Sequence, residues 1–96
     1  MKAEPLIKQR LVIDDNSFAE LTLWRVPQSV KGSLHAFKYR LAFVADGICI
    51  LRYDNEVGKG DHKHIGNVEY TYVFTTPQRL LVDFWNDVDA WRMGHG

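Results

Sequence analysis

Residues 35–54, HAFKYRLAFVADGICILRYD, decide the fold because they contain two apolar runs joined by a tight turn. The dipeptide Asp46-Gly47 between such runs is a strong signal for a two-residue β-hairpin loop. We therefore predict antiparallel strands over residues 35–45 and 48–54. The odd positions of the first strand are mostly aromatic or aliphatic, which predicts that this face packs in the core.

The turn also predicts which residues of the hairpin lie opposite each other. Counting back from the turn, Arg40 lies opposite Tyr53, and Lys38 lies opposite Asn55. Directly paired side chains project from the same face of a sheet. We therefore expect Lys38, Arg40 and Tyr53 to form one group, next to the polar segment that follows the hairpin.

Two further strands and a turn are predicted upstream of this hairpin. Residues 8–13 and 18–26 flank Asp14-Asp15-Asn16-Ser17, a cluster of turn-forming residues, and together they predict another hairpin. Downstream, residues 67–74 predict a fifth strand. The sequence thus predicts five mostly antiparallel strands.

A C-terminal helix is predicted to follow the strands. Thr76-Pro77 is a standard helix start, because Thr caps the first turn and Pro fits the first helical position. The residues at helical spacing that form an apolar stripe are Leu80, Leu81, Phe84, Trp85, Val88 and Trp91. The acidic residues Asp83, Asp87 and Asp89 are expected to face solvent. The predicted fold is α+β, a five-stranded sheet packed by one α-helix, in a single domain over residues 1–96.

The composition is that of an ordinary globular domain, with 96 residues of which 46% are hydrophobic and 25% are charged. The formal net charge is zero, although residues 25–64 contain seven Lys/Arg against four Asp/Glu. The one cysteine, Cys49, is expected to be buried, and its isolation favours a cytoplasmic location. No apolar run is long enough to span a membrane. So small a domain is only modestly stable alone, which favours a partner chain or a homodimer.

The densest group of chemically active side chains is at residues 53–66, YDNEVGKGDHKHIG. We predict a polar loop there, because Gly58-Lys59-Gly60 is a strong turn signal that forms either an anion-binding nest or a flexible turn. His62 and His64 lie two residues apart in this segment. Histidine changes charge nearest neutral pH, which suits it to proton transfer.

These residue types are typical of phosphodiester cleavage in RNA. A base removes the 2′-OH proton, an acid protonates the leaving oxygen, and cations stabilise the phosphorane. On this interpretation His62 and His64 transfer the protons, Arg40 and Lys59 hold the phosphate, and Tyr53 stacks on a base or orients the catalytic groups. Further candidates for contact with the substrate are Lys38, Lys63, Asp54 and Asp61.

Other interpretations of the same residues stay open. Asp61, His62 and His64 are a set of mixed N/O donors that could bind a metal. The sequence has no C-x-x-C and no H-E-x-x-H motif, so we expect no metal and no cofactor. The two histidines could also be ordinary surface residues. His35, on the odd face of its strand, is expected to be packed and hydrogen-bonded in the core.

Residues 24–91 resemble the TumE-like toxin family of bacterial and archaeal toxin–antitoxin pairs. The likeness rests on YDN-E-GKGDHKH-G at residues 53–66 and, upstream, on His35, Phe37, Lys38 and Tyr39. The resemblance implies a toxin whose antitoxin partner is a helix-turn-helix DNA-binding protein. It implies no catalytic residues, so the roles given above rest on chemistry alone.

These observations predict a toxin that acts as a metal-independent RNA endonuclease. The alternative is a non-catalytic toxin or interaction module that binds its target or nucleic acid through the cationic face of the sheet. Transfer chemistry on nucleotides or on a protein is a weaker alternative, since no nucleotidyltransferase signature is present.

Overall fold

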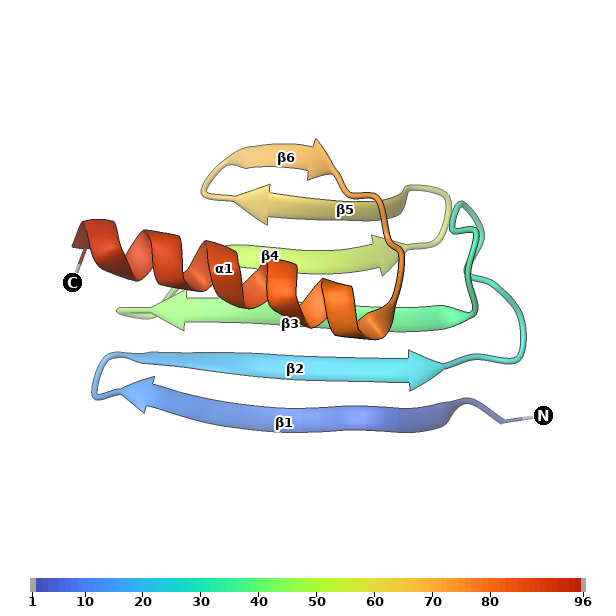
Figure 1. Ribbon diagram of the computed structural model, residues 1–96, viewed down its shortest axis with the longest axis horizontal. Helices are drawn as coiled ribbons and strands as arrows, with labels where there is room; N and C mark the ends of the chain where they lie inside the picture. Colours follow the sequence, from blue (N-terminus) through green and yellow to red (C-terminus); the bar gives the residue numbers. More distant parts are fainter. Residues whose placement is uncertain (1, 96) are drawn as a thin grey trace.

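A computed structural model describes residues 2–95 and shows one helix packed on an antiparallel sheet (Figure 1). The strands follow one another across the sheet in sequence order, each paired with its neighbour in the chain. In that order they are β1 (Glu4–Asp14), β2 (Ser17–Arg25), β3 (Phe37–Ala45), β4 (Ile48–Glu56), β5 (Gly60–Ile65) and β6 (Val68–Thr71), followed by α1 (Pro77–His95).

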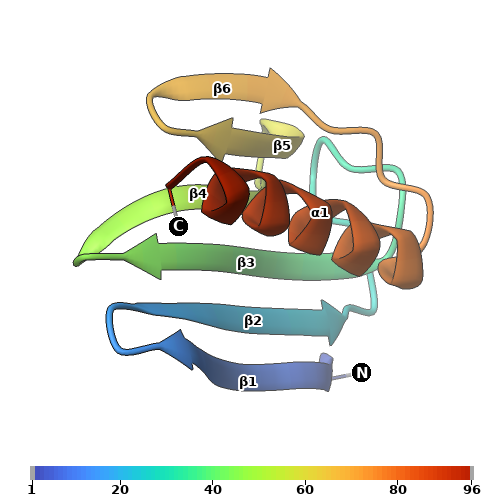
Figure 2. The ribbon, with the colours of Figure 1, turned by 60° about the vertical axis from the view of Figure 1, so that its left-hand side comes forward.

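The helix α1 covers one face of the sheet and runs diagonally in front of β3 and β4 (Figures 1 and 2). The core lies between them and contains the odd positions of β3, as predicted, together with the apolar stripe of the helix. Its fully buried members include Tyr39, Leu41, Phe43, Leu51, Tyr53, Leu80, Phe84 and Val88. Within residues 2–95 no helix is both long enough and apolar enough to cross a membrane.

The start of α1 is where the sequence predicts it. The backbone N–H of Arg79 donates to the Thr76 hydroxyl at 3.1 Å, and the helix begins at Pro77. Thr76 therefore satisfies a backbone donor that the first turn leaves unpaired. The α+β class and the single C-terminal helix are confirmed.

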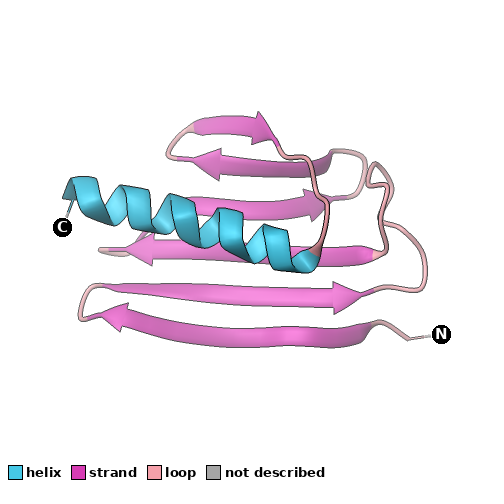
Figure 3. Cartoon of the chain, viewed as in Figure 1, coloured by secondary structure: helices cyan, strands magenta, loops and turns pink. Residues whose placement is uncertain are grey.

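The predicted strand number is wrong, because the sheet has six strands (Figure 3). Residues 60–65, expected in a loop, form β5, where Asp54 lies opposite His62 and Arg52 lies opposite His64. The polar side chains of β5 obscured its strand character in the sequence. They are compatible with a strand because cross-strand neighbours supply opposite charges and hydrogen-bonding groups.

The predicted register of the β3–β4 hairpin is also wrong beyond the first residues after the turn. Val44 lies opposite Cys49, but Phe43 lies opposite Leu51, so Ile50 is an extra residue that forms a β-bulge. A one-residue shift moves every later side chain to the other face. Tyr53 therefore faces α1 instead of standing beside Arg40.

Cys49 is exposed, which corrects the expectation that it is buried. It lies opposite Val44, an even position of β3, whereas the helix packs on the odd positions. An apolar strand sequence therefore did not identify which side of the strand is covered.

Candidate functional site

The face of the sheet away from α1, called the open face below, brings mostly polar side chains of five strands, β2 to β6, into two adjacent rows. Directly paired residues project from the same face, so each row is a continuous line of side chains. One row is Thr22, Arg40, Asp54, His62 and Thr71, and the next is Glu20, Ala42, Arg52, His64 and Glu69. The bulge in β4 creates this arrangement by turning Arg52 and Asp54 toward the open face.

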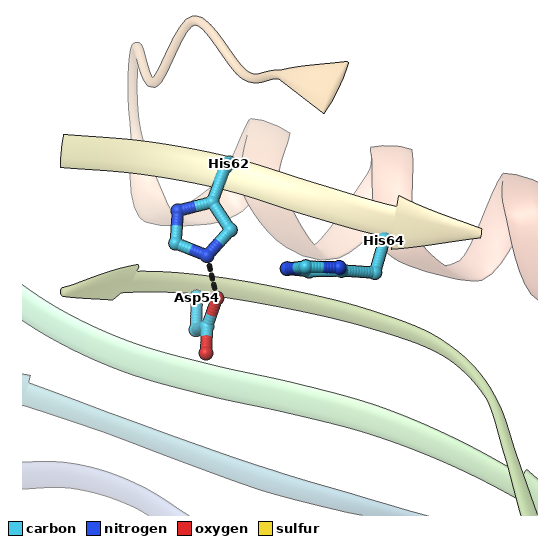
Figure 4. Close-up of side chains that lie close together, drawn as sticks. All are labelled: Asp54, His62 and His64. Carbon is cyan, nitrogen blue, oxygen red and sulfur yellow. Dashed lines mark ion pairs between the residues drawn. The ribbon is translucent and has the colours of Figure 1, made fainter. Parts of the chain in front are cut away.

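Asp54, His62 and His64 converge at the centre of these rows, and we call them the Asp–His cluster (Figure 4). The three side chains offer donor atoms that lie within 4.8 Å of one another. His62 Nε2 is 2.8 Å from Asp54 Oδ1, and the two imidazole rings meet edge to face with centroids 5.1 Å apart. Asp54 and His62 are buried, with only 5% and 3% of their surfaces exposed.

Both ring nitrogens of His62 face oxygen atoms of the protein. Nδ1 is 3.2 Å from the Gly60 carbonyl oxygen, and Nε2 faces Asp54. Despite the short distance, the contact between Nε2 and Asp54 Oδ1 lacks hydrogen-bond geometry. Neither atom has a hydrogen-bond partner among residues 2–95, and the buried Nε2 of His64 has none either.

Three charged side chains surround the cluster. Arg52 Nε lies 3.2 Å from Asp54 Oδ2. Glu56 and Glu69 place carboxylate oxygens 3.9 and 4.0 Å from His62 Nε2, and both side chains are about half exposed. The open face is therefore of mixed charge near the cluster, and not the cationic surface that the sequence suggested.

Tyr53 and Lys63, two residues expected at the site, are on the opposite face. Both contact Asp87 of α1: the Tyr53 hydroxyl donates to its carboxylate, and Lys63 Nζ lies 3.1 Å from the same oxygen. Burial, with the Asp87 hydrogen bond, raises the pKa of Tyr53. These contacts attach the helix to the sheet, so Asp87 does not simply face solvent as expected.

Asp61 also faces the helix side, where it accepts three hydrogen bonds. The donors are Ser33 Oγ at 2.5 Å, His35 Nε2 at 2.6 Å and the Tyr39 hydroxyl at 2.7 Å. Asp61 thus joins the 26–36 loop to β3 and β5. It is separated from His62 and His64 by the sheet, so the metal-binding set proposed from the sequence does not assemble. His35 is packed and hydrogen-bonded, as expected.

The remaining predicted residues, Arg40, Lys38 and Lys59, are not members of the cluster. Arg40 is exposed on the open face, directly opposite Asp54. The Lys38 ammonium donates to the carbonyl oxygen of Asn55. Lys59 is exposed in the β4–β5 turn, where its N–H donates to Glu56 and that of Gly58 donates to Lys31. Since these two amides are already bonded, Gly58-Lys59-Gly60 acts as a turn and not as an anion nest.

Sequence reasoning missed Arg52, Glu56 and Glu69 as neighbours of the histidines. His62 and His64 are two residues apart, and Glu69 lies two residues beyond a Gly66-Asn67 turn. This spacing is compatible with a short hairpin that would place all three side chains on one face. Within residues 61–65, the two histidines alternate with other residues, and this period of two was the available signal for the hairpin. Arg52 could not be placed without knowledge of the bulge.

A hollow elsewhere on the molecule is lined by none of the cluster residues. It has a volume of about 770 Å³ and is formed by the β1–β2 and β3–β4 turns with the end of α1, including Asp14, Asp46 and Asp89. The Asp–His cluster is instead part of an extended sheet surface.

Comparison with known proteins agrees with the resemblance found in the sequence. The family model described as toxin TumE matches residues 2–92. No curated protein and no solved structure matches the chain significantly. The matched segment contains all six strands, the Asp–His cluster and most of α1. The chain therefore belongs to the toxin TumE family.

Proposed function

We propose that the chain is the toxin of a toxin–antitoxin pair and that it cleaves RNA on the open face of its sheet. Membership of a toxin family supports the first part and implies an antitoxin partner. The observation that carries the second part is the Asp–His cluster, whose titratable side chains converge on a sheet face that no described helix covers. We assign the partner to the helix-turn-helix class that the resemblance implies.

Arg40 is the side chain best placed to hold the RNA backbone. It is exposed, lies directly opposite Asp54, and makes no ion pair with any other described residue. A free guanidinium binds phosphate oxygens in a fixed, bidentate geometry. An extended sheet surface also suits a linear polymer better than a small ligand, which would need a pocket.

The geometry favours a division of roles that differs from the one predicted from the sequence. His62 is 3% exposed, and both of its nitrogens face protein oxygens, so it is poorly placed to exchange a proton with RNA directly. We propose that His62 positions His64 through the edge-to-face contact of their rings, and that His64 is the group nearest the substrate. Tyr53 and Lys63 take no part, since they contact α1 on the other face.

Purified protein incubated with total cellular RNA tests this proposal. His64→Ala is expected to reduce cleavage by at least 10²-fold, the usual contribution of a general acid or base. Tyr53→Phe is the matched control, because it removes a hydroxyl from the helix side of the neighbouring strand β4 and should leave cleavage within a few-fold of the original. Equal cleavage by His64→Ala and the unchanged protein would contradict the proposal.

A toxin that only binds its target is the second candidate, and the exposure of Arg40 is the observation that favours it. In that case Arg40→Glu abolishes growth arrest in a host without the antitoxin, His64→Ala retains it, and cellular RNA stays intact. RNA cleavage requires the opposite result for His64→Ala. Comparing the two variants in the same host separates the candidates.

A further inference from the structure

We propose that the Asp–His cluster is a binding site for one divalent transition-metal ion, with ligands from Asp54, His62 and His64. Their donor atoms lie within 4.8 Å of one another on adjacent strands. The inference concerns binding to the protein alone and is tested without RNA; while the ion is bound, the ligating nitrogen of His64 cannot also transfer a proton. It differs from the metal site considered from the sequence, in which Asp61 took the place of Asp54.

His35–Asp61 and His62–Asp54 are both His–Asp pairs, but their hydrogen bonds differ. Only the second pair has the pattern expected of a metal site. In the His35–Asp61 pair, the backbone N–H of Phe37 donates to His35 Nδ1, so Nε2 has the proton and donates to Asp61. In His62 the contact at Nδ1 is a carbonyl oxygen, that of Gly60, so Nδ1 has the proton. A neutral His62 therefore presents an unprotonated Nε2 to Asp54.

An unprotonated nitrogen and a carboxylate oxygen 2.8 Å apart repel each other unless a cation lies between or beside them. His62 Nε2 and Asp54 Oδ1 are both buried, and neither has a hydrogen-bond partner in the described part of the chain. The buried Nε2 of His64 is in the same condition. Buried polar atoms without partners are costly, and a shared metal ion would satisfy all three at once.

The surroundings of the cluster favour a cation. Besides Asp54, the carboxylates of Glu56 and Glu69 approach His62 Nε2 to 3.9 and 4.0 Å, and Glu69 lies directly opposite His64. Either of them, or water, can complete the coordination shell. Arg52 lies against Oδ2 of Asp54, which leaves Oδ1 for the ion. The Gly60 carbonyl fixes the His62 ring, as outer hydrogen bonds do for metal-ligating histidines.

The donor set indicates the class of metal. Two imidazoles and a carboxylate suit Zn²⁺, Mn²⁺, Co²⁺, Ni²⁺ or Fe²⁺, whereas Mg²⁺ prefers oxygen ligands alone. Ligands with bonds of about 2.1 Å lie at most about 4.2 Å from each other. The cluster must therefore contract by several tenths of an ångström on binding, which rotation of the half-buried His64 side chain allows.

A protonated His62 paired with Asp54 is the competing explanation, and His64 separates the two. An imidazolium–carboxylate pair leaves no unprotonated Nε2 on His62 for a metal and does not involve His64, so any binding of metal to the chain would be unchanged in His64→Gln. A metal site needs all three ligands, so His64→Gln should weaken it at least tenfold.

The experiment uses the full chain, stripped with EDTA and dialysed, and titrates it calorimetrically with Zn²⁺, Mn²⁺ and Mg²⁺. We expect one equivalent of Zn²⁺ or Mn²⁺ to bind, the melting temperature to rise on binding, and Mg²⁺ to do neither. With Co²⁺ we expect visible absorption bands that disappear in His64→Gln. Asp54→Asn provides a second variant, and the melting temperature of each metal-free variant shows whether it is folded.

His35→Gln is the matched control, because it removes the histidine of the other His–Asp pair and should leave metal affinity unchanged. Absence of Zn²⁺ and Mn²⁺ binding to the original protein would overturn the proposal. So would equal affinity in folded His64→Gln and Asp54→Asn variants, or equal losses in His35→Gln. None of these results depends on RNA, so they leave the proposed cleavage to its own test.

Discussion

On the helix side of the sheet, three tyrosine hydroxyls each donate a hydrogen bond to an aspartate carboxylate. Tyr39 donates to Asp61 at 2.7 Å, Tyr72 donates to Asp83 at 2.6 Å, and Tyr53 donates to Asp87. Burial is the main reason that the pKa of each tyrosine is raised, and the hydrogen bond to its aspartate adds to the effect. These phenols are therefore stabilised in their neutral, protonated form by the fold.

This arrangement predicts a loss of stability at alkaline pH. Below pH 10 the phenols are protonated in both folded and unfolded chains, so the stabilisation is fully present. Above pH 10 the unfolded chain releases protons that the folded chain retains, and the free energy of unfolding falls. In Tyr72→Phe, the slope of the free energy of unfolding against pH should be less steep by the equivalent of about one proton. Denaturant titrations at pH 9–11.5 measure this slope.

Tyr70→Phe is the control for this measurement, since the Tyr70 side chain is exposed and no hydrogen bond to its hydroxyl is found in residues 2–95. An unchanged pH slope in Tyr72→Phe would mean that the Tyr72–Asp83 bond does not persist in solution.

At the scale of secondary-structure elements, the sequence predicted the turn, the helix start and its apolar stripe, because each has a local signal. Asp46-Gly47 specifies its turn, and Thr76-Pro77 specifies its cap. The bulge at Ile50 has no such signal, since the apolar run 48–51 fits either register. As the cluster depends on the register, the sequence could place His62 beside His64 but could not pair them with Asp54.

The bulge leads to a prediction about deletions. Removing Ile50 leaves Val44 opposite Cys49 and Phe43 opposite Leu51, because Ile50 is the unpaired residue. We expect this variant to fold cooperatively, with a loss of about 1–3 kcal/mol. Removing Arg52 instead shifts the later residues of β4 to the wrong face, which should abolish cooperative unfolding.

Urea unfolding followed by tryptophan fluorescence compares the two deletions, with circular dichroism as a check on the β content. Similar stability of the two variants, or unfolding of the Ile50 deletion alone, would contradict the register that the structure shows.

At the scale of the whole molecule, the one helix and six strands of residues 2–95 form two layers with unlike faces. The helix side contains the buried apolar residues, and the open face contains the Asp–His cluster and Cys49. The sequence predicted the two layers from the helix stripe and the odd positions of β3. It could not predict how charge is distributed over the open face, because Glu56 and Glu69 approach His62 only in the folded sheet.

Cys49 reports on the accessibility of that face. Because the chain has one cysteine and its side chain is exposed, a maleimide should label the native protein completely, at a rate within about tenfold of an unfolded thiol. Cys49→Ser gives the background. Labelling that requires denaturant would show that something covers this part of the sheet.

The order of the elements along the chain has a consequence for biosynthesis. Every strand pairs with its neighbour in sequence, so the sheet can assemble hairpin by hairpin during translation. Among the described residues, however, its apolar side is covered by α1 alone, which the ribosome makes about 1–5 s after β6 at ordinary rates of synthesis. Until α1 packs on the sheet, Leu41, Phe43 and Leu51 have no cover on that side. A chain truncated between Thr71 and Pro77 therefore has every strand of the sheet but no helix to cover its apolar side, and is a substrate for chaperones and proteases once it is released.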